Sequence, residues 1–185
     1  MKQALLVIDA QQELIDGNEK EKSVFNKDHL LDNINSVLNK ALDSDSFVVF
    51  IRDKDVAKGQ GKGFEIHPYI DIPKNAKIFD KEATNSFYDT PLLDFLQDNM
   101  IKHLVVMGCK TEHCIDTAVR TATVNGFDVT LVGDGHSTTD SQSITAEQSI
   151  DHHNEVLHGH YNIDNFSVVR NVGENLFIPN HDDYR

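Results

Sequence analysis

Short, strongly apolar runs alternate along this chain with segments whose apolar residues recur at every third or fourth position. The runs indicate strands, and each is followed by a polar residue or a glycine. They cover residues 4–8, 47–51, 76–79, 104–107, 129–132 and 166–169. Because neighbouring residues of these runs are mostly apolar, the runs are typical of strands buried on both faces, as in a parallel sheet between helices.

The segments between the strands carry helical patterns. Residues 28–42 give the clearest one, because their apolar side chains fall on one face. Thr90-Pro91 is a typical helix start and Gly126 a typical helix end. Further helices are expected over 92–96, 111–125 and 146–157. The alternation predicts an α/β three-layer sandwich: a central, mostly parallel sheet of about six strands, with helices on both faces and a Rossmann-like topology.

The chain is long enough for one domain with a substantial core. We expect a single domain over residues 1–185, with its core at about 4–170 and a C-terminal tail at 171–185. The tail is mostly polar, but Leu176, Phe177 and Ile178 are expected to dock on the body or on a partner subunit.

The charge balance restricts the possible partners. Acidic residues number 30 against 17 basic ones, which gives a net charge of −13 without clusters of Lys or Arg. This argues against a nucleic acid or an anionic membrane surface as partner. The first nine residues do not resemble a secretory signal, and no apolar run is long enough to span a membrane. With only two cysteines, the expectation is a soluble protein of the reducing cytoplasm.

Three reactive side chains follow predicted strands, where ligands bind in open parallel sheets. They are Asp9, Lys81 and Cys114. A thiol in the first turn of a helix is expected to favour the nucleophilic thiolate. Each residue also has a simpler interpretation: a buried structural cysteine, a capping or ion-paired carboxylate, and a solvated lysine. As a set, they suggest a carboxylate that takes the thiol proton, and an ammonium that stabilises both charges.

Three ordered motifs resemble the isochorismatase-like cysteine hydrolase family, outside its nicotinamidase branch. The first is an apolar strand followed by Asp-x-Gln, here residues 5–11. The second is a lysine followed by Ser-Phe and Thr-x-Leu, here residues 81–92. The third is Gly-x-x-Thr-Glu-x-Cys followed by Thr-Ala, here residues 108–118. The strand and acid at 129–134 also fit, so the resemblance spans about residues 4–170.

The resemblance implies a catalytic triad of Asp9 as general base, Lys81 as electrostatic partner and Cys114 as nucleophile. It also implies a non-proline cis peptide between Cys109 and Lys110, which would turn the Lys110 N–H toward an oxyanion beside the Cys114 N–H. The implied activity is hydrolysis of a C–N amide-type bond of a small molecule through a thioester. The implied assembly is a homodimer or homotetramer, and no cofactor is expected.

The substrate pocket is expected to include four further residues, namely Gln11, Phe87, Tyr88 and His136. Where the nicotinamidase branch has the metal-binding sequence Asp-x-His, this chain has Asp53-Lys54-Asp55. A metal site of Asp53, Asp55 and His67 is conceivable, but a solvated acidic turn is the expected outcome, and we predict no metal.

Three other functions are compatible with the sequence. A Cys-His hydrolase would use Cys114, His136 and Asp134. A metal-binding module would use a cluster of histidines, namely His152, His153, His158 and His160. A non-catalytic relative would bind a small molecule without turning it over.

Overall fold

A single twisted sheet organises the fold. The computed structural model describes residues 1–178 and 181, and within them seven strands follow the order β3-β2-β1-β4-β5-β7-β6. The strands are β1 Lys2–Ile8, β2 Phe47–Asp53, β3 Lys77–Lys81, β4 Ile101–Cys109, β5 Asp128–Ser137, β6 Tyr161–Asn162 and β7 Asn165–Arg170. All neighbouring pairs are parallel except β6 and β7. The mostly parallel sheet is confirmed, with the two-residue edge strand β6 as the addition to the six expected.

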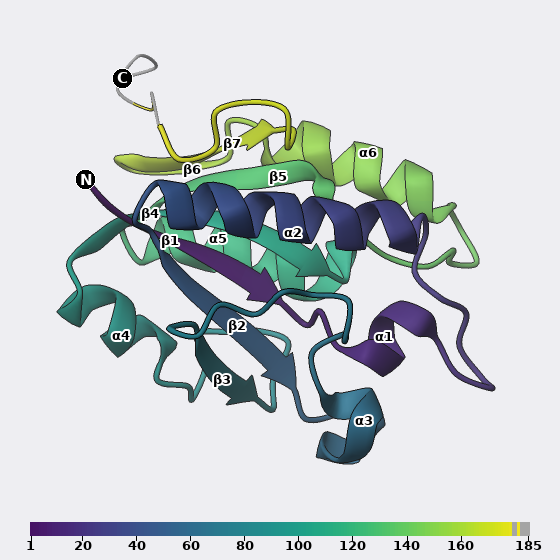
Figure 1. The fold of residues 1–185 in the computed structure, drawn as a ribbon. Coiled ribbons are helices and arrows are strands. Elements are labelled where there is room, and N and C mark those ends of the chain that lie inside the picture. Colours follow the sequence, from purple (N-terminus) through teal and green to yellow (C-terminus); the bar gives the residue numbers. More distant parts are fainter. Residues whose placement is uncertain (179–180, 182–185) are drawn as a thin grey trace.

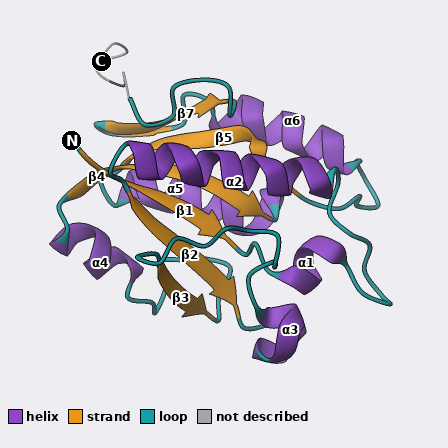
Figure 2. Ribbon diagram, viewed as in Figure 1, coloured by secondary structure: helices purple, strands orange, loops and turns teal. Residues whose placement is uncertain are grey.

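Helices cover both faces of this sheet, as expected (Figure 2). They are α1 Gln12–Asp16, α2 Lys27–Asp43, α3 Gly61–Phe64, α4 Leu92–Asp98, α5 Asp116–Val124 and α6 Ala146–Leu157, with a 3-10 turn η1 Val56–Gly59 and a π-helical turn η2 Thr111–Ile115. The bounds of α6 are those predicted, and the Thr145 hydroxyl caps it by accepting a hydrogen bond from the Gln148 N–H at 3.2 Å. Among the described residues, none of the helices has both the length and the apolar character that crossing a bilayer requires.

Two apolar cores lie on opposite faces of the sheet. Leu5 and Val7 of β1 pack with the apolar face of α2, which crosses the front of the sheet in Figure 1. Leu6 and Ile8 point the other way and join the core formed with α4, α5 and α6. This alternation explains why β1 is apolar at every position from 4 to 8.

The C-terminal tail docks on the body through two of its three apolar residues. Leu176 and Phe177 are buried in the core under α2, whereas Ile178 is exposed. The rest of the predicted tail, residues 179–180 and 182–185, lies outside the described residues.

The carboxyl ends of four neighbouring strands meet at one rim of the sheet, next to α1 and α3 (Figure 1). Strands β2 and β3 are aligned there so that Arg52 lies opposite Asp80 and Asp53 lies opposite Lys81. Arg52 forms a two-pronged ion pair with Asp80, in which Nε donates to Oδ1 at 2.8 Å and Nη2 donates to Oδ2 at 3.1 Å. The register therefore brings the side chains of Asp53 and Lys81 to the edge of the sheet where ligands bind.

Replacing Gly108 by alanine is expected to destabilise the protein by about 3 kcal/mol or more. Gly108 has φ +122°, and a Cβ atom there would lie 2.0 Å from the carbonyl oxygen of Ile8. The backbone of β1 cannot move away, because Ile8 also pairs with Ile51 of β2. Urea unfolding would measure the loss, with Gly173→Ala as the control because a Cβ at Gly173 meets no atom within 4 Å. Equal stabilities of the two variants would contradict this packing.

Candidate active site

The structure brings Asp9, Lys81 and Cys114 together at the rim of the sheet. The Lys81 Nζ lies 3.0 Å from Asp9 Oδ2 and donates to Cys114 Sγ at 3.4 Å. The three residues are 1 %, 1 % and 8 % exposed, respectively. An acid, an ammonium and a thiol that are far apart in the sequence therefore form one buried cluster.

Asp9 leaves β1 in a left-handed conformation. Its φ is +51°, and its N–H still donates to the Ile51 carbonyl at 2.9 Å, so the residue stays fixed to the neighbouring strand. Aspartate tolerates this region better than most residues, but the conformation still costs of order 1 kcal/mol. Such strain at a residue held by its surroundings is common at functional sites.

Cys114 lies in a π-helical turn rather than in the first turn of the α-helix predicted from residue 111. The turn η2 runs over Thr111–Ile115, and α5 begins only at Asp116. The Ile115 N–H donates to the Lys110 carbonyl at 3.3 Å, which is the wider spacing of a π-turn. The peptide bond between Cys109 and Lys110 is cis, as the resemblance implied.

A second carboxylate joins the cluster. Asp53, which ends β2, accepts a short hydrogen bond from Lys81, so this ammonium contacts two carboxylates and the thiol. From the sequence, Asp53 was expected only as a metal ligand or a solvated residue. Its position two residues after the apolar run 47–51, close to the place that Asp9 has after the run 4–8, was the signal available in the sequence.

Gln11 holds the end of β2 in place. Its side chain is fully buried; it accepts from the Asp53 N–H at 2.7 Å and donates to the carbonyls of Asp53 and Phe64 at 3.0 and 2.9 Å. It therefore positions the Asp53 backbone and α3, and it does not line the cavity in which Cys114 lies.

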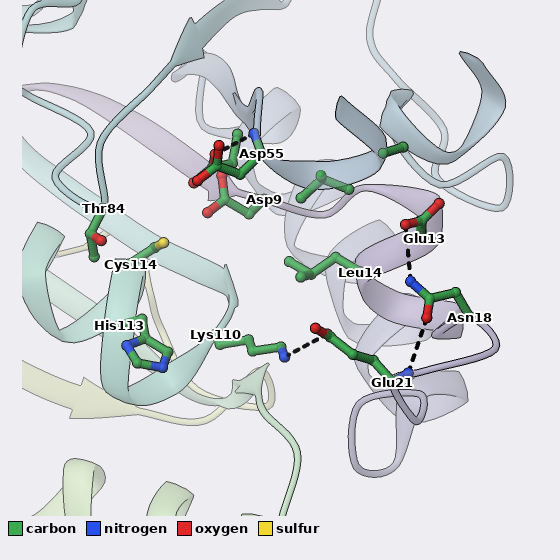
Figure 3. A pocket seen from close by; sticks show the side chains of 13 residues that line it. Asp9, Glu13, Leu14, Asn18, Glu21, Asp55, Thr84, Lys110, His113 and Cys114 are labelled. Atoms are coloured by element: carbon green, nitrogen blue, oxygen red, sulfur yellow. Dashed lines mark hydrogen bonds and ion pairs between the residues drawn. The ribbon is translucent and has the colours of Figure 1, made fainter. Parts of the chain in front are cut away.

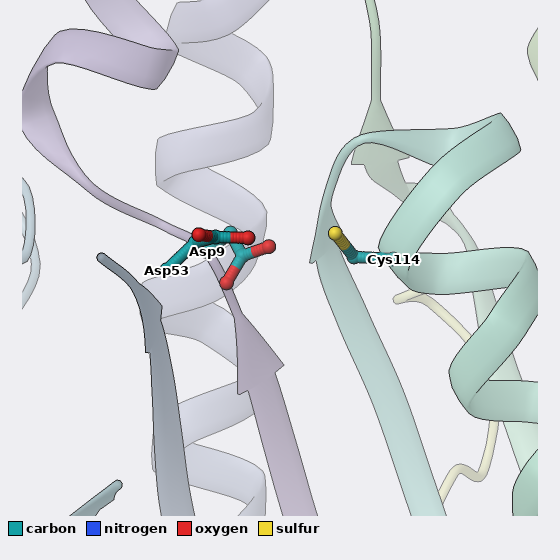
Figure 4. Close-up of side chains that lie close together, drawn as sticks. All are labelled: Asp9, Asp53 and Cys114. Atoms are coloured by element: carbon teal, nitrogen blue, oxygen red, sulfur yellow. The ribbon is translucent and has the colours of Figure 1, made fainter. Parts of the chain in front are cut away.

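The cluster also contains the one group of three candidate metal-binding atoms found among residues 1–178 and 181. A carboxylate oxygen of Asp9, one of Asp53 and the Cys114 Sγ lie within 4.8 Å of one another (Figure 4). The Lys81 ammonium contacts all three side chains, so a metal ion there would have to displace a buried cation. The conceivable set that included His67 does not assemble, because His67 lies 3.4 Å from Asp16 instead.

Burial dominates the acid–base properties of the cluster. It raises the pKa of Asp9 to about 6 and, with the charge of Asp9 adding to it, the pKa of Cys114 to about 12. Burial opposes the charged form of Lys81, but the negative charges around it raise the pKa of that ammonium nonetheless. The expected resting thiolate is therefore wrong: burial outweighs the favourable charges, and the resting cysteine is a neutral thiol.

One oxygen of Asp9 lacks a close hydrogen-bond partner, although its carboxylate and the Cys114 thiol are near enough to shift each other's pKa as hydrogen-bonding groups. Oδ2 contacts Lys81, whereas Oδ1 is buried and accepts no hydrogen bond from the described residues. An unsatisfied buried acceptor is costly, so its persistence indicates a functional role. A free carboxylate oxygen beside a neutral thiol is suited to receive a proton.

A cavity of about 310 Å³ opens in front of Cys114 (Figure 3). It is lined by Asp9, Glu13, Leu14, Asn18, Glu21, Asp53, Asp55, Val56, Ala57, Thr84, Lys110, His113 and Cys114. Those from α1 and the loop after it were missed in the sequence, because a five-residue helix is too short to show a periodic pattern.

The other residues predicted for the pocket lie elsewhere. Phe87 packs in the core, with its ring centroid 6.5 Å from that of Phe127, and Tyr88 is 67 % exposed. His136 is buried, with one ring nitrogen 2.9 Å from the Thr111 hydroxyl and the other 2.9 Å from Asn154 Oδ1. None of them lines the cavity in which Cys114 lies.

The histidine-based alternatives lose their structural basis. Both nitrogens of His136 are engaged away from Cys114, and burial lowers the pKa of this imidazole to about 4. Of the C-terminal histidines, His158 accepts from the Val169 N–H at 3.1 Å, and His160 lies 3.4 Å from Arg120. In the part of the chain that the structure describes, these histidines form no group of three ligands.

Comparisons with known proteins identify the family to which the chain is related. The isochorismatase domain model matches residues 3–156. The chain is 32% identical to streptothricin hydrolase of Streptomyces noursei over 142 residues, which are 75% of this chain and 55% of that protein. It spans about half the length of the first curated relatives it matches.

Solved structures share the fold over almost the whole chain. An isochorismatase from Pseudomonas putida superposes with a TM-score of 0.80 at 26% identity, covering 92% of this chain and 88% of that one. A cysteine hydrolase from Pseudomonas syringae gives a TM-score of 0.80 at 16% identity, covering 93% and 89%, and shows the shared fold alone. The matched region contains the whole buried cluster around Lys81, and the chain belongs to the isochorismatase family.

Proposed function

We propose that this protein is a cysteine-dependent hydrolase that cleaves a C–N amide-type bond of a small molecule through a thioester. The observation that carries the proposal is the Lys81 ammonium, which lies 3.0 Å from Asp9 and 3.4 Å from the Cys114 sulfur beside a cavity. The relative from Streptomyces noursei supports hydrolysis as the reaction class, because it is named a streptothricin hydrolase.

In the first half-reaction, Cys114 attacks the amide carbon and passes its proton to Asp9 Oδ1. Because the pKa of the thiol lies well above that of Asp9, this transfer is uphill in the resting site and becomes favourable only as the S–C bond forms. The backbone N–H groups of Lys110 and Cys114 are assigned to the oxyanion. When the intermediate collapses, the C–N bond breaks, and Asp9 returns the proton to the leaving nitrogen.

In the second half-reaction, water hydrolyses the thioester. Asp9 takes a proton from the attacking water, the S–C bond breaks, and the sulfur recovers a proton as the acid leaves. Lys81 keeps its proton throughout, because its pKa is raised by the surrounding negative charges. Its role is to stabilise the developing thiolate and to hold Asp9 in place.

The test is turnover of a panel of small amides, ureides and lactams, followed by mass spectrometry with and without hydroxylamine. We expect ammonia release or ring opening, and hydroxylamine should divert the acyl group to a hydroxamate, as it does for thioesters. A mass increase on Cys114 at early times would identify the intermediate. Turnover without an acyl adduct and without a hydroxamate would contradict the thioester.

The pH profile should report Asp9. We expect kcat/KM to fall about tenfold per unit below pH 6, because only the ionised carboxylate accepts the thiol proton. Asp53→Asn should move this acid limb to lower pH, since the charge of Asp53 contributes to the raised pKa of Asp9. Rates of hydrolysis measured between about pH 4 and 8 for both proteins would show the acid limb and its shift. A profile without an acid limb, or a limb that Asp53→Asn moves upward, would contradict the role of Asp9.

We also propose a reducing, cytoplasmic location and a homodimer or homotetramer. The mechanism requires an unmodified thiol, and both cysteines are free in the structure. A thiol count on protein isolated without reductant would check the reducing location. Sedimentation at micromolar concentration would check the oligomeric state. A modified Cys114 or a monomer would contradict them.

A further inference from the structure

Two buried polar residues outside the catalytic cavity have no role in the mechanism proposed above. They are His136 near the end of β5 and Thr111 at the start of η2, which are 3 % and 0 % exposed. The Nδ1 atom of His136 lies 2.9 Å from the Thr111 hydroxyl, and Nε2 lies 2.9 Å from Asn154 Oδ1. A buried imidazole and a buried hydroxyl are costly unless both are hydrogen-bonded, so the pair depends on this contact.

The side chain of Asn154 fixes the direction of each hydrogen bond. Its amide nitrogen donates to the Gly133 carbonyl at 2.9 Å, which leaves its oxygen facing His136. That oxygen can only accept, so Nε2 of His136 carries the proton. Burial lowers the pKa of His136 to about 4, so the ring is neutral near pH 7 and Nδ1 carries no proton. The Thr111 hydroxyl therefore donates to Nδ1.

An irregularity in β5 brings His136 to this place. Val106 of β4 lies opposite Leu131 of β5. Two residues later on β4, Gly108 lies opposite His136, which is five residues later on β5. Strand β5 thus carries three extra residues at this point, and they place His136 beside the end of β4. Bulges that redirect a side chain are common next to active sites.

Consecutive residues of β5 anchor Lys110 on both sides. Cys109, which precedes it, is paired with Ser137 in the sheet. Thr111, which follows it, donates its hydroxyl hydrogen bond to His136. The Lys110 N–H is the group assigned to the oxyanion in the proposed mechanism, and its position is therefore set by the end of β5.

The turn η2 is held by further contacts from the same side. Turns of the π type are rare and occur mainly at functional sites. The side chain of Thr111 is branched and stiff, so a hydrogen bond to its hydroxyl also restrains its backbone. The next residue, Glu112, accepts from the Thr138 hydroxyl at 2.9 Å. Two side chains from the end of β5 and the loop after it therefore fix the start of η2.

We propose that His136 is a positioning residue, which acts through the Thr111 hydroxyl to hold the Lys110 N–H where the oxyanion forms. This inference rests on the proposed hydrolase function and adds a residue to its machinery. His136 does not line the cavity and does not touch the reacting atoms. Its effect arises because an oxyanion donor that is displaced by a fraction of an ångström loses much of its stabilising effect.

The test compares two reactions of Cys114 in the Thr111→Val protein, in which the hydroxyl is lost and the shape is kept. Acylation by p-nitrophenyl acetate forms an oxyanion, whereas alkylation by iodoacetamide forms none. We expect the acylation rate, measured as p-nitrophenolate release above that of Cys114→Ser protein, to fall about tenfold or more. The alkylation rate should change little, and Thr111→Ser should restore most of the acylation rate. Unchanged acylation, or an equal fall in both reactions, would overturn the inference.

A second buried pair provides the matched control. The Thr130 hydroxyl lies 2.9 Å from Nε2 of His103, and both residues are fully buried near the start of β4 rather than at the catalytic rim. Thr130→Val removes the same kind of hydrogen bond, so we expect a similar loss of stability in urea and an unchanged acylation rate. An equal fall of acylation in Thr130→Val would show general loosening of the sheet and overturn the assignment.

Substitutions of the histidine locate the contact that matters. The side-chain oxygen of asparagine lies about where Nδ1 of histidine lies, whereas the end of glutamine reaches the place of Nε2. His136→Asn should therefore keep an acceptor for Thr111 and retain more of the acylation rate than His136→Gln. The reverse order would make the bond to Asn154 the important one and overturn the assignment.

An NMR measurement separates the inference from the function on which it rests. His136→Gln should shift the amide proton resonance of Lys110, which is distant in the sequence, more than His136→Asn does. An unshifted resonance would overturn the positioning role even in an active hydrolase. If Cys114 of the unmodified protein is not acylated, the hydrolase proposal fails, and the Lys110 resonance alone decides the positioning role.

Discussion

Cys114→Ser is expected to lower kcat/KM for amide hydrolysis about a thousandfold or more. Asp9 can accept a proton from a thiol as the S–C bond forms, but a hydroxyl is a far weaker acid and leaves the intermediate less readily. The serine has nearly the same shape, and the cluster around Lys81 keeps its charges, so the fold should persist. Ammonia release and far-UV circular dichroism measure the two effects, and a variant that keeps its activity would remove Cys114 as the nucleophile.

Chemical labelling gives a second measure of the same cysteine within one protein. Iodoacetamide should modify Cys114, which lines the cavity and can pass its proton to Asp9 as the S–C bond forms, and leave Cys109 untouched. Cys109 is fully buried in the core, and that burial raises the pKa of its thiol far above the usual range. Peptide mapping would locate the label. An inert Cys114 would favour a non-catalytic binding protein over a hydrolase.

Lys81→Met is expected to abolish activity and to lower the free energy of unfolding by about 3–5 kcal/mol at neutral pH. The Lys81 side chain is fully buried, and its removal leaves the carboxylates of Asp9 and Asp53 without a counter-charge. Urea unfolding measures the loss. Lys54→Met is the control, since the ion pair of Lys54 with Glu82 lies at the surface and its loss should have little measurable effect.

The cause of this destabilisation can be checked through pH and a second substitution. In the native protein, the pKa of Asp9 is already raised to about 6. Protonation of Asp9 therefore stabilises the folded state at acid pH, and this stabilisation is lost as the pH rises through about 6. Without Lys81 the native pKa should rise further, and the variant should regain stability relative to wild type on acidification. Lys81→Met combined with Asp53→Asn should also recover part of the loss. A loss in the free energy of unfolding that neither acidification nor Asp53→Asn reduces would indicate lost packing instead.

Strand patterns and their order predicted most of the fold and the convergence of the cluster. Runs such as 4–8 are apolar because both faces of β1 are covered, and this constraint is visible in the sequence. The carboxyl ends of parallel strands share one rim, so Asp9, Lys81 and Cys114 could be brought together before any coordinates were known.

The directions of individual side chains and the shortest helices could not be predicted from the sequence. Phe87 faces the core rather than the cavity, and His136 is fixed by Thr111 and Asn154, contacts that depend on packing between distant segments. The neutral thiol of Cys114 was missed for the same reason, because helix position is local but burial is a property of the whole fold. Asp53 was the residue most open to prediction, since it faces Lys81 across adjacent strands.

Strand β3 lies at the border of the sheet and is joined to it only through β2, so its alignment decides where Lys81 points. A slip by a single residue would turn that ammonium to the opposite side and empty the centre of the cluster. Two oppositely charged couples, Arg52 with Asp80 and Asp53 with Lys81, lie at matching places on the two strands and oppose such a slip. The Lys81 ammonium, which the chemistry needs, thus also helps to fix the register of the edge strand β3. The rate of turnover should therefore depend on the correct alignment of β3 with β2.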